Sequence, residues 1–395
     1  MESILLEKND VRNVDVVIFI YNVNLRGGTE IMSLNLMKAM NSSNLQCRIL
    51  SLVPYQGNDG NILSFRQFAL NQYLQIAESQ ACKLFAPLKS LHVLRRLLRN
   101  VVDMIRPKVF INFTYDLLPA TPRGNGITKM YGIFHWSVFG YEQSIIQRIK
   151  QKSFFNRYLS MALFTCRTRE IHRCLHRLDN LIVLTQEGKK EALSLMPDIG
   201  DERIYVIPNF IPFDRLNSNV SSLNNKTAIF VGRLSAEKGC YRLLDIWERI
   251  SIENPNWQLK IYGEGNEQAG MERIIEQRKL ANIHFCGFKE DIDSIYRNAD
   301  LLLCTSDSEG FGLVLIEAMY YGVIPFSFDC PVSPKELIGN AGVLARCYNC
   351  QEYAQLVNDL IASPDRMKQL QHNAIVQASK FYKSNIIELW KKLIN

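Results

Sequence analysis

Residues 300–319 read DLLLCTSDSEGFGLVLIEAM, an apolar run, a glycine-flanked turn and a second apolar run. The run at 300–306 is typical of a buried strand and the residues after Gly312 of a helix, so this stretch predicts a strand–turn–helix unit. Glu309 precedes the turn and Glu317 follows about two helical turns later, inside the helix. Both carboxylates can accept hydrogen bonds from hydroxyl groups while N–H groups of the turn face an anion. A helix cap plus a surface carboxylate is the alternative interpretation.

The same alternation of short apolar runs and helical patterns extends along the whole chain and predicts an α/β fold with parallel sheets. The expected strands lie at 14–21, 48–52, 109–114, 129–135, 180–185 and 204–208, and then at 227–232, 257–263, 282–287, 300–306, 323–328 and 342–345. Helical patterns in the first half lie near 30–41, 89–105 and 142–178. Two doubly wound domains follow, with loops at the carboxyl ends of their strands forming a cleft.

A polar stretch at 217–226, NSNVSSLNNK, has no apolar period and predicts a loop or an interdomain linker. The last helix is expected at 365–395. It carries Phe381 and Trp390 as apolar anchors.

The composition excludes several classes of protein. The 395 residues are 47% hydrophobic and 22% charged, a balance typical of globular domains and not of disordered or fibrous chains. No apolar run reaches the roughly 18–20 residues that span a bilayer, and the first residues do not resemble a secretory signal. Ten cysteines without an export signal favour reduced thiols and a cytoplasmic location. The lone Cys347/Cys350 pair and the His172/His176 pair do not suffice for a metal site, so none is expected.

Positive charge concentrates in the first half, with 26 Lys and Arg against 17 Asp and Glu over residues 1–208, and 20 against 22 over 209–395. The excess lies mostly at 83–108 and 148–177. These segments fit attraction to an anionic membrane surface or a solvated helix face, and the sequence leaves both open. Nucleic acid is disfavoured, because neither segment carries a recognised nucleic-acid-binding signature.

Two further loops that follow strands can bind an anion. The loop at 22–28 ends in Gly28, where the backbone can approach a ligand closely and the next helix offers free N–H groups; a simple chain reversal is the alternative. The loop at 232–239, GRLSAEKG, carries Arg233 and Lys238. These side chains can grip phosphate oxygens or remain solvated surface cations.

In combination and in order, these motifs resemble glycosyltransferase family 4. The resemblance covers nearly all of residues 204–380 and, more weakly, the loop of Gly28. It rests on Gly232-Arg233-x4-Lys238-Gly239, Tyr262-Gly263-Glu264-Gly265, Phe285-x-Gly287-Phe288, Glu309-Gly310-Phe311-Gly312 and the Glu309/Glu317 pair. It implies the GT-B fold, two Rossmann-like doubly wound domains facing a central cleft. The implied domains are an acceptor-binding domain at 1–208, a nucleotide-sugar-binding domain at 209–378 and a C-terminal helix at 379–395 that crosses back to the first.

The resemblance also implies transfer of a sugar from a nucleotide diphosphate to an acceptor hydroxyl, with retention of configuration, no cofactor and no required metal. Arg233 and Lys238 would neutralise the donor diphosphate, Glu317 would hold the ribose hydroxyls, and Glu309 would hold the donor sugar without forming a covalent intermediate. The other implied donor-binding residues are Gly28 near the phosphates, Gly287 and Phe288 near the base, and Gly310, Phe311, Gly312 and Val314 through their backbone.

His135 ends an expected strand and matches a histidine that lies beside the donor sugar in the family, so it joins Glu309 as an expected catalytic residue. A hydrogen-bonded structural histidine is the alternative. The chain departs from the family's Gly-Pro-x-Glu turn, because Ser333 replaces the glycine while Pro334 and Glu336 are kept. The local backbone and the donor preference are therefore open.

Together these observations predict a cytoplasmic, metal-independent retaining transferase of a hexose or N-acetylhexosamine, with a UDP-sugar as donor. The expected acceptor is a lipid-linked oligosaccharide or a surface polysaccharide such as lipopolysaccharide or capsule. The basic N-terminal domain would associate peripherally with the inner face of the membrane. The alternatives are a nucleotide-sugar epimerase or hydrolase of the same fold, and a non-catalytic nucleotide-sugar-binding subunit of another transferase.

Overall fold

The computed structural model describes residues 13–25, 27–65, 86–135, 137, 146, 154–214 and 220–395. The first twelve residues, on which the expectation about a secretory signal rests, lie outside the described residues. So do residues 83–85 and 148–153 of the basic segments and residues 217–219 of the polar stretch.

The chain divides into two compact units. Unit 1 comprises Met1–Ile207 and Ile387–Asn395, and unit 2 comprises Pro208–Ile386. Residues 379–386 therefore belong to unit 2, although they were expected in the segment that crosses back to the first domain.

The described part of the polar stretch, residues 220–226, is anchored within unit 2. Ser221 Oγ and Asn225 Nδ2 each donate a hydrogen bond to Asp300 Oδ1, both over 2.9 Å. Asp300 is fully buried at the start of a strand, so this loop is fixed to the sheet.

Unit 1 is built on a seven-stranded parallel sheet with the order β3-β2-β1-β4-β5-β6-β7. Its strands are β1 (Val16–Ile20), β2 (Cys47–Ser51), β3 (Ile62–Ser64), β4 (Val109–Asn112), β5 (Lys129–Phe134), β6 (Asn180–Val183) and β7 (Ile204–Val206). The central strands β1 and β4 are buried along their whole length, because helices cover both faces of the sheet. The expected strands are confirmed, except that β3 was not predicted; three residues at a sheet edge are too few to show a pattern.

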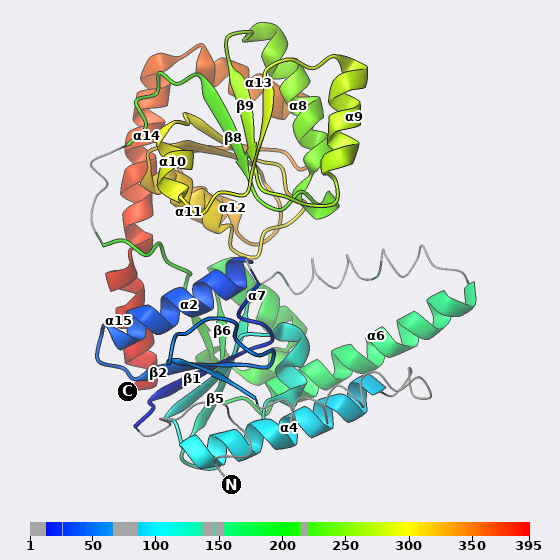
Figure 1. Ribbon diagram of the computed structural model, residues 1–395, viewed down its shortest axis with the longest axis vertical. Coiled ribbons are helices and arrows are strands. Elements are labelled where there is room, and N and C mark those ends of the chain that lie inside the picture. The colour runs from blue at the N-terminus through cyan, green and yellow to red at the C-terminus, as the bar shows by residue number, and fades with distance from the viewer. Residues whose placement is uncertain are drawn as a thin grey trace. The chain divides into compact units, whose positions relative to one another are not determined.

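The helices of unit 1 lie on both faces of this sheet, with α4 and α6 on one side and α2 and α15 on the other (Figure 1). In the described residues they are α2 (Gly28–Asn41), α4 (Ala86–Ile105), α6 (Phe154–Leu175), α7 (Gln186–Leu195) and α15 (Lys383–Ile394), with 3-10 turns η2 (Tyr115–Ala120), η3 (Pro197–Ile199) and η4 (Asp201–Arg203). On α4, the buried Leu94, Leu98 and Val101 recur at helical spacing and pack into the same core as Phe19 of β1.

Unit 2 is built on a six-stranded parallel sheet with the order β10-β9-β8-β11-β12-β13. Its strands are β8 (Thr227–Val231), β9 (Gln258–Tyr262), β10 (Ile283–Gly287), β11 (Leu301–Cys304), β12 (Ile324–Phe328) and β13 (Val343–Ala345). Its helices are η5 (Ala236–Lys238), α8 (Cys240–Glu253), α9 (Gln268–Arg278), α10 (Ile292–Arg297), α11 (Leu313–Tyr320), α12 (Pro334–Ile338), α13 (Cys350–Ile361), α14 (Pro364–Ala378) and η6 (Ser379–Phe381). The fold class predicted from the sequence, α/β with doubly wound parallel sheets, is confirmed.

The C-terminal helical stretch is interrupted, so the prediction of one helix over 365–395 is wrong. Helix α14 ends at Ala378, and Tyr382 has an extended backbone before α15 begins. Tyr382 forms a β-bridge with Ile211, and Phe381 O accepts the Ile211 N–H over 2.9 Å. The backbone at this point bonds to another segment of unit 2 instead of continuing a helix.

In each sheet the first strands along the chain are added toward one edge and the later strands toward the other edge. The order therefore reverses between two neighbouring strands, and the loops that follow these two strands lie side by side. In unit 1 the pair is β1 and β4, and in unit 2 it is β8 and β11. Such points in open α/β sheets are where ligands bind, outside the carboxyl ends of the strands. Among the helices that the structure describes, none is long and apolar enough to cross a membrane.

Candidate functional site

The loops after β8 and β11 meet through an ion pair between Lys238 and Glu309. Lys238 Nζ lies 2.7 Å from Glu309 Oε1, and the two residues are 71 positions apart in the chain. They meet because β8 and β11 are adjacent parallel strands whose carboxyl ends share one edge of the sheet. Two residues that the sequence singled out separately are thus in direct contact.

The Glu309 carboxylate is buried and held by more than one donor. Ser306 Oγ donates to the same Oε1 over 2.5 Å, and Ser333 Oγ donates to the Glu309 backbone oxygen over 3.0 Å. Glu309 also forms a β-bridge with Val332. The sequence did not single out Ser306, because a serine near a strand end carries no recognisable spacing; Ser333 was visible only as a departure from the family turn.

The electrostatics favour a charged Lys238. Burial alone would lower the pKa of its ammonium group, but the charge of Glu309 and the hydrogen bond to it outweigh burial and raise that pKa above its ordinary value. Burial, followed by the charge of Glu309, raises the pKa of the neighbouring Cys304 thiol to about 11. Near pH 7 the Lys238 ammonium group is therefore charged and the Cys304 thiol is neutral.

The backbone of the loop that carries Lys238 lies in close contact with the backbone of the loop after β11. Gly239 adopts a left-handed conformation with φ of 69°, and a Cβ there would lie 2.0 Å from Thr305 O. Thr305 Oγ1 in turn donates to Lys238 O over 2.9 Å. Arg242 forms an ion pair with Asp307 on the same loop. Gly239 is needed here because no side chain fits between the two loops.

A second close approach joins the β8 loop to the loop after β9. A Cβ on Gly263 would lie 1.9 Å from Gly232 O, and one on Gly265 would lie 2.1 Å from Leu234 O. Leu234 N–H donates to Glu264 O over 2.9 Å. The glycines of the Tyr-Gly-Glu-Gly motif therefore let these two loops pair along their backbones.

Arg233 lies on the same β8 loop, but its environment differs from that of Lys238. The residue is exposed, and no residue that the structure describes forms a hydrogen bond or an ion pair with its guanidinium. The structure leaves its donors open to an anion at the loop surface.

The turn at Gly310–Gly312 leads into α11, as the sequence predicted. Gly312 is the N-cap residue, has φ of 81°, and provides no side chain to cap the helix. Phe311 is buried and packs edge-on against Phe381 at 5.8 Å between ring centres. Val314 lies in the first turn of α11, where backbone N–H groups have no partner in the preceding turn.

Glu317 lies one turn inside α11 and is not in contact with the Lys238–Glu309 pair. Its Oε2 accepts a hydrogen bond from the hydroxyl of Tyr296 over 2.8 Å. Burial raises the pKa of the Glu317 carboxyl above its ordinary value, and the Tyr296 hydrogen bond acts in the opposite direction. Tyr296 of α10, which the sequence did not indicate, orients this carboxylate.

Gly287 ends β10, and Phe288 follows it at the same edge of the sheet. Gly287 has φ of 64°, and its carbonyl accepts the Gly263 N–H over 2.9 Å. Phe288 is 40% exposed. The two expected base-contacting residues thus border the loops that carry the other expected donor-binding residues.

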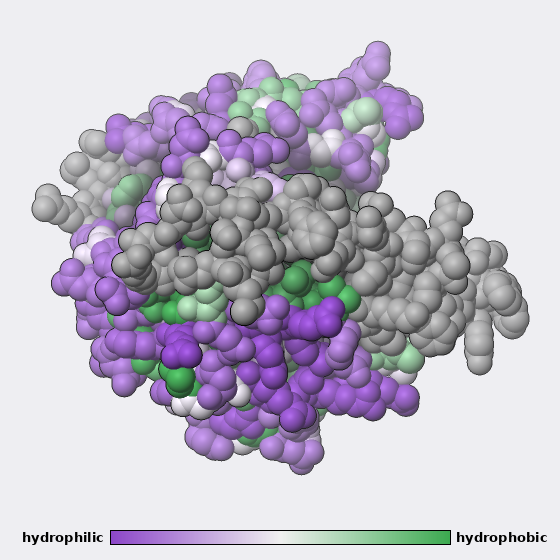
Figure 2. Space-filling view, turned by 60° about the horizontal axis from the view of Figure 1, so that its bottom comes forward, coloured by the Kyte–Doolittle hydropathy of each residue, from purple (hydrophilic) through white to green (hydrophobic). Residues whose placement is uncertain are grey.

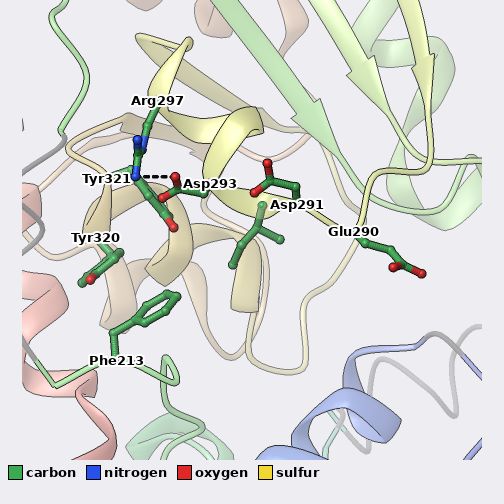
Figure 3. A pocket seen from close by; sticks show the side chains of 8 residues that line it. Phe213, Glu290, Asp291, Asp293, Arg297, Tyr320 and Tyr321 are labelled. Atoms are coloured by element: carbon green, nitrogen blue, oxygen red, sulfur yellow. Dashed lines mark ion pairs between the residues drawn. The ribbon is translucent and has the colours of Figure 1, made fainter.

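A pocket of about 420 Å³ lies next to these loops, as Figure 3 shows. Its lining comes from the α10 segment, the end of α11 and Phe213, which stacks on Tyr320 at 4.9 Å between ring centres. The lining residues are Phe213, Glu290, Asp291, Ile292, Asp293, Arg297, Tyr320 and Tyr321. Its Asp293 pairs with Arg297, and Asp291 caps α10. Asp291 and Asp293 thus take part in interactions within the protein. None of the site residues predicted from the sequence lines the pocket.

His135 and Gly28 belong to unit 1. His135 directly follows β5, is buried, and lies 4.7 Å from Phe113 between ring centres. Its Nε2 has no hydrogen-bond partner among the described residues, and burial lowers the pKa of its imidazole to about 3. The alternative interpretation of His135 as a hydrogen-bonded structural residue therefore has no support from Nε2. Gly28 opens α2, whose N-cap Gly27 provides no side-chain hydrogen bond.

Within the described part of the chain, no three His, Cys, Asp or Glu side chains gather closely enough to hold a metal ion. The nine cysteines described are all free thiols. Metal independence of the reaction stays a prediction.

The comparisons with known proteins identify relatives of this fold. Residues 214–377 match the family model for glycosyl transferases group 1. The amylovoran biosynthesis glycosyltransferase AmsD of Erwinia amylovora is 28% identical over 307 residues, which cover 75% of this chain and 86% of that protein.

Solved structures with the GT-B fold are similar over almost the whole chain. TarM of S. aureus, in complex with fondaparinux, alpha-GlcNAc-glycerol and UDP, has a TM-score of 0.74 at 14% identity and covers 96% of this chain and 99% of its own. HepE of Anabaena, in complex with UDP, has a TM-score of 0.67 at 19% identity, with the same coverage of each chain. These likenesses show the fold.

Proposed function

Because this chain is a glycosyltransferase with the GT-B fold and a group 1 transferase domain, we propose that it transfers a hexose or N-acetylhexosamine from a UDP-sugar to a hydroxyl group with retention of configuration. The acceptor in this proposal is a lipid-linked oligosaccharide or a surface polysaccharide. The name of AmsD supports the polysaccharide, and the UDP complexes of TarM and HepE support the nucleotide. The observation that carries the proposal is the Lys238–Glu309 pair at the reversal point of the unit 2 sheet.

In this proposal Lys238 and Arg233 receive the donor diphosphate. A lysine ammonium has three donors, and Glu309 uses one of them, which leaves two for phosphate oxygens. Arg233 adds an exposed guanidinium suited to bidentate phosphate contacts. The N–H groups at Gly310–Val314 add the positive end of α11. These groups stabilise the charge that grows on the leaving diphosphate.

Glu309 holds the donor sugar. Its Oε1 accepts bonds from Lys238 and Ser306, so the second oxygen serves the sugar hydroxyls. Glu317, oriented by Tyr296, binds the ribose hydroxyls, and the base lies near Gly287 and Phe288.

The proposed chemical step needs no protein nucleophile. The acceptor oxygen bonds to the anomeric carbon as the bond from that carbon to the diphosphate oxygen breaks, and the acceptor proton passes to a diphosphate oxygen. His135, neutral near pH 7, borders the reacting sugar through its unpartnered Nε2, and Gly28 approaches the phosphates. No metal takes part in this proposal.

The proposed location is the inner face of the membrane, close to a lipid-linked acceptor. Its support is the positive charge of the first half of the chain, with 26 Lys and Arg against 17 Asp and Glu over residues 1–208. Each basic residue near a charged leaflet is worth about 1 kcal/mol.

Calorimetry with UDP, GDP and ADP, with and without EDTA, tests the donor site. We expect UDP to bind and its affinity to survive EDTA. Release of UDP from UDP-sugars should then depend on an added glycan acceptor, whereas an epimerase or a hydrolase would turn over without one. Binding without turnover under any condition would indicate the non-catalytic subunit.

Variants of the ion pair test the proposed roles. Lys238→Gln and Glu309→Gln should each lower turnover by about 100-fold or more, because each removes a group that stabilises transition-state charge or holds the sugar. Lys368→Gln removes the same charge from an exposed position on α14 and should leave turnover unchanged. Full activity of Lys238→Gln or Glu309→Gln would rule out the assigned roles.

A further inference from the structure

Three arginines from different segments of unit 1 lie close enough for the charges of two of them to act on the third, Arg95. Two hydrogen bonds to η2 bring α4 and α6 together here, because Arg95 donates to Pro119 O and Cys174 Sγ donates to Leu118 O over 2.8 Å. Arg95 lies on α4, Arg123 lies on the exposed loop after η2, and Arg177 lies just after α6. We call these three residues the arginine cluster. They belong to unit 1, whereas the proposed donor-binding loops around Lys238 belong to unit 2.

Among the residues that the structure describes, no carboxylate pairs with the guanidinium groups of the cluster. Arg95 Nε and Nη2 donate to the carbonyl oxygen of Pro119 over 3.0 and 2.5 Å. Arg177 Nη2 is buried and has no hydrogen-bond partner among the described residues. A buried guanidinium nitrogen without a partner carries a desolvation cost that a bound anion would remove.

Other charged groups act on the Arg95 guanidinium. Burial, and then the positive charges of Arg177 and Arg123, lower the pKa of Arg95, while Cys174 and Glu170 act in the opposite direction. Glu170 already pairs with the exposed Arg173 over 2.7 Å.

Other carboxylates nearby are used elsewhere. Asp103 accepts a hydrogen bond from Asn125 over 3.1 Å, and Asp179 accepts the Met130 N–H over 2.7 Å. Among the described residues, neither carboxylate forms an ion pair with an arginine of the cluster.

We propose that the arginine cluster binds a phosphate or diphosphate group. Guanidinium groups match phosphate oxygens in geometry and charge, and three of them from three segments can neutralise a group that carries two negative charges. Arg95 contributes its charge and its remaining N–H groups, because Nε and Nη2 bond to Pro119 O. Arg123 is exposed and gives the ligand access, while Arg177 has a buried nitrogen that lacks a hydrogen-bond partner among the described residues.

The surface around the arginine cluster is hydrophilic and positively charged, so a phosphate ligand can reach it from solution or from a membrane surface. Figure 2 looks toward the end of unit 1 that carries α4, and hydrophilic residues make up much of the coloured surface there. The exposed residues of α4 include Arg96 and Arg99, which add general positive charge around the site. The phosphate can belong to a lipid headgroup or to a soluble compound, and the chemistry of recognition is the same.

Calorimetry with inorganic diphosphate tests this site on the full-length protein. The proposed donor site is first saturated with UDP, so that diphosphate cannot bind there. If UDP does not bind, the Lys238→Gln protein is used, because this variant lacks the proposed phosphate-binding lysine. The test therefore remains valid even if the proposed function is wrong. Diphosphate should bind, and Arg123→Gln and Arg177→Gln should each weaken it by about tenfold or more, as expected for charged hydrogen bonds. If Arg177→Gln lowers the melting temperature, Arg123→Gln still tests the site, because it changes an exposed loop residue.

Arg99→Gln is the matched control, because it removes one positive charge from an exposed position on the same helix as Arg95. It should change diphosphate affinity by less than about twofold, since diffuse surface charge is largely screened by salt. Absence of diphosphate binding, or an equal loss with Arg99→Gln and Arg123→Gln, would overturn the proposal.

Cosedimentation with phosphatidylcholine vesicles, with and without phosphatidic acid, separates the two sources of phosphate. Binding that depends on phosphatidic acid and on Arg123 but not on Arg99 identifies a lipid headgroup. Diphosphate binding without this vesicle effect identifies a soluble phosphate compound. Either outcome supports the arginine cluster as a phosphate site.

Discussion

His135 illustrates how burial decides the chemistry of a single residue. Its imidazole packs beside Phe113, and only 8% of the residue is exposed. Burial lowers its pKa from an ordinary 6.5 to about 3, so the ring is neutral in the physiological range. A neutral imidazole can donate and accept hydrogen bonds at a sugar, but it provides no positive charge for a leaving phosphate. In the proposed mechanism that charge comes from Lys238 and Arg233.

This shift predicts a pH dependence of stability. The unfolded chain binds a proton at this histidine more readily than the folded protein, so the stability that neutral His135 provides is complete above pH 6.5 and is lost as the pH falls toward 3. At about pH 5 the loss from this residue is roughly 2 kcal/mol, since one pKa unit is worth about 1.4 kcal/mol. Urea unfolding of wild type and His135→Gln at about pH 7 and pH 5 should show the smaller pH effect in the variant. Equal pH effects would show that His135 does not titrate in this way.

The residues of the candidate site could be predicted from the sequence only where a motif carries them. Lys238 and Glu309 were expected on separate loops, but their direct contact depends on β8 and β11 being neighbours. Ser306 and Tyr296 hold the two carboxylates by single hydrogen bonds, and such partners leave no pattern of spacing or polarity. Tertiary structure alone brings them to the site.

At the scale of elements, glycines determine how the loops after β8 and β9 pair. Gly265 needs no positive φ, yet a Cβ there would lie 2.1 Å from the Leu234 carbonyl oxygen. The contact is with backbone, so it cannot be relieved by rotating a side chain. The Arg233–Lys238 loop is positioned by this pairing, because Leu234 N–H bonds to Glu264 O.

Gly265→Ala should therefore separate these two loops. We expect a loss of about 1–3 kcal/mol in the free energy of unfolding, as for other overpacked sites, together with weaker UDP binding. Gly60→Ala is the control, because a Cβ at Gly60 has no atom within 4 Å, and it should be close to neutral. Urea unfolding and UDP calorimetry measure both effects. A Gly265→Ala protein with wild-type stability and affinity would contradict the steric argument.

Elements with long apolar runs were predictable, and short or interrupted ones were not. Strands β1 and β4 are buried on both faces and appear in the sequence as continuous apolar runs. The edge strand β3 and the interruption at Tyr382 depend on pairing with distant segments. Local sequence does not encode such pairing.

At the scale of the whole molecule, the last nine residues are part of unit 1. Trp390 is buried, and Tyr131 of β5 donates a hydrogen bond to Leu393 O over 3.1 Å. Helix α15 begins in unit 2 and ends in unit 1, so a single helix belongs to both.

Trp390→Ala should accordingly destabilise unit 1 and spare unit 2. Removal of a buried tryptophan side chain costs about 3–5 kcal/mol. Hydrogen exchange should show faster exchange in β5 of unit 1, while UDP affinity stays at the wild-type level. Leu389→Ala, at a residue 38% exposed on the same helix, should have little effect. Loss of UDP binding in Trp390→Ala would show that the stabilities of the two units are not separable.

The assignment of Ile387–Asn395 to unit 1 makes unit 2 an insertion in the chain. Its polypeptide enters after Ile207 and leaves before Ile387, so exchange with a relative requires two junctions. Replacing residues 208–386 alone would keep residues 387–395 of the recipient protein, which belong to its unit 1. A single crossover near residue 208 would instead combine unit 1 of the recipient with the C-terminal residues of the donor protein. Recombination between such enzymes should therefore succeed most often as an internal cassette.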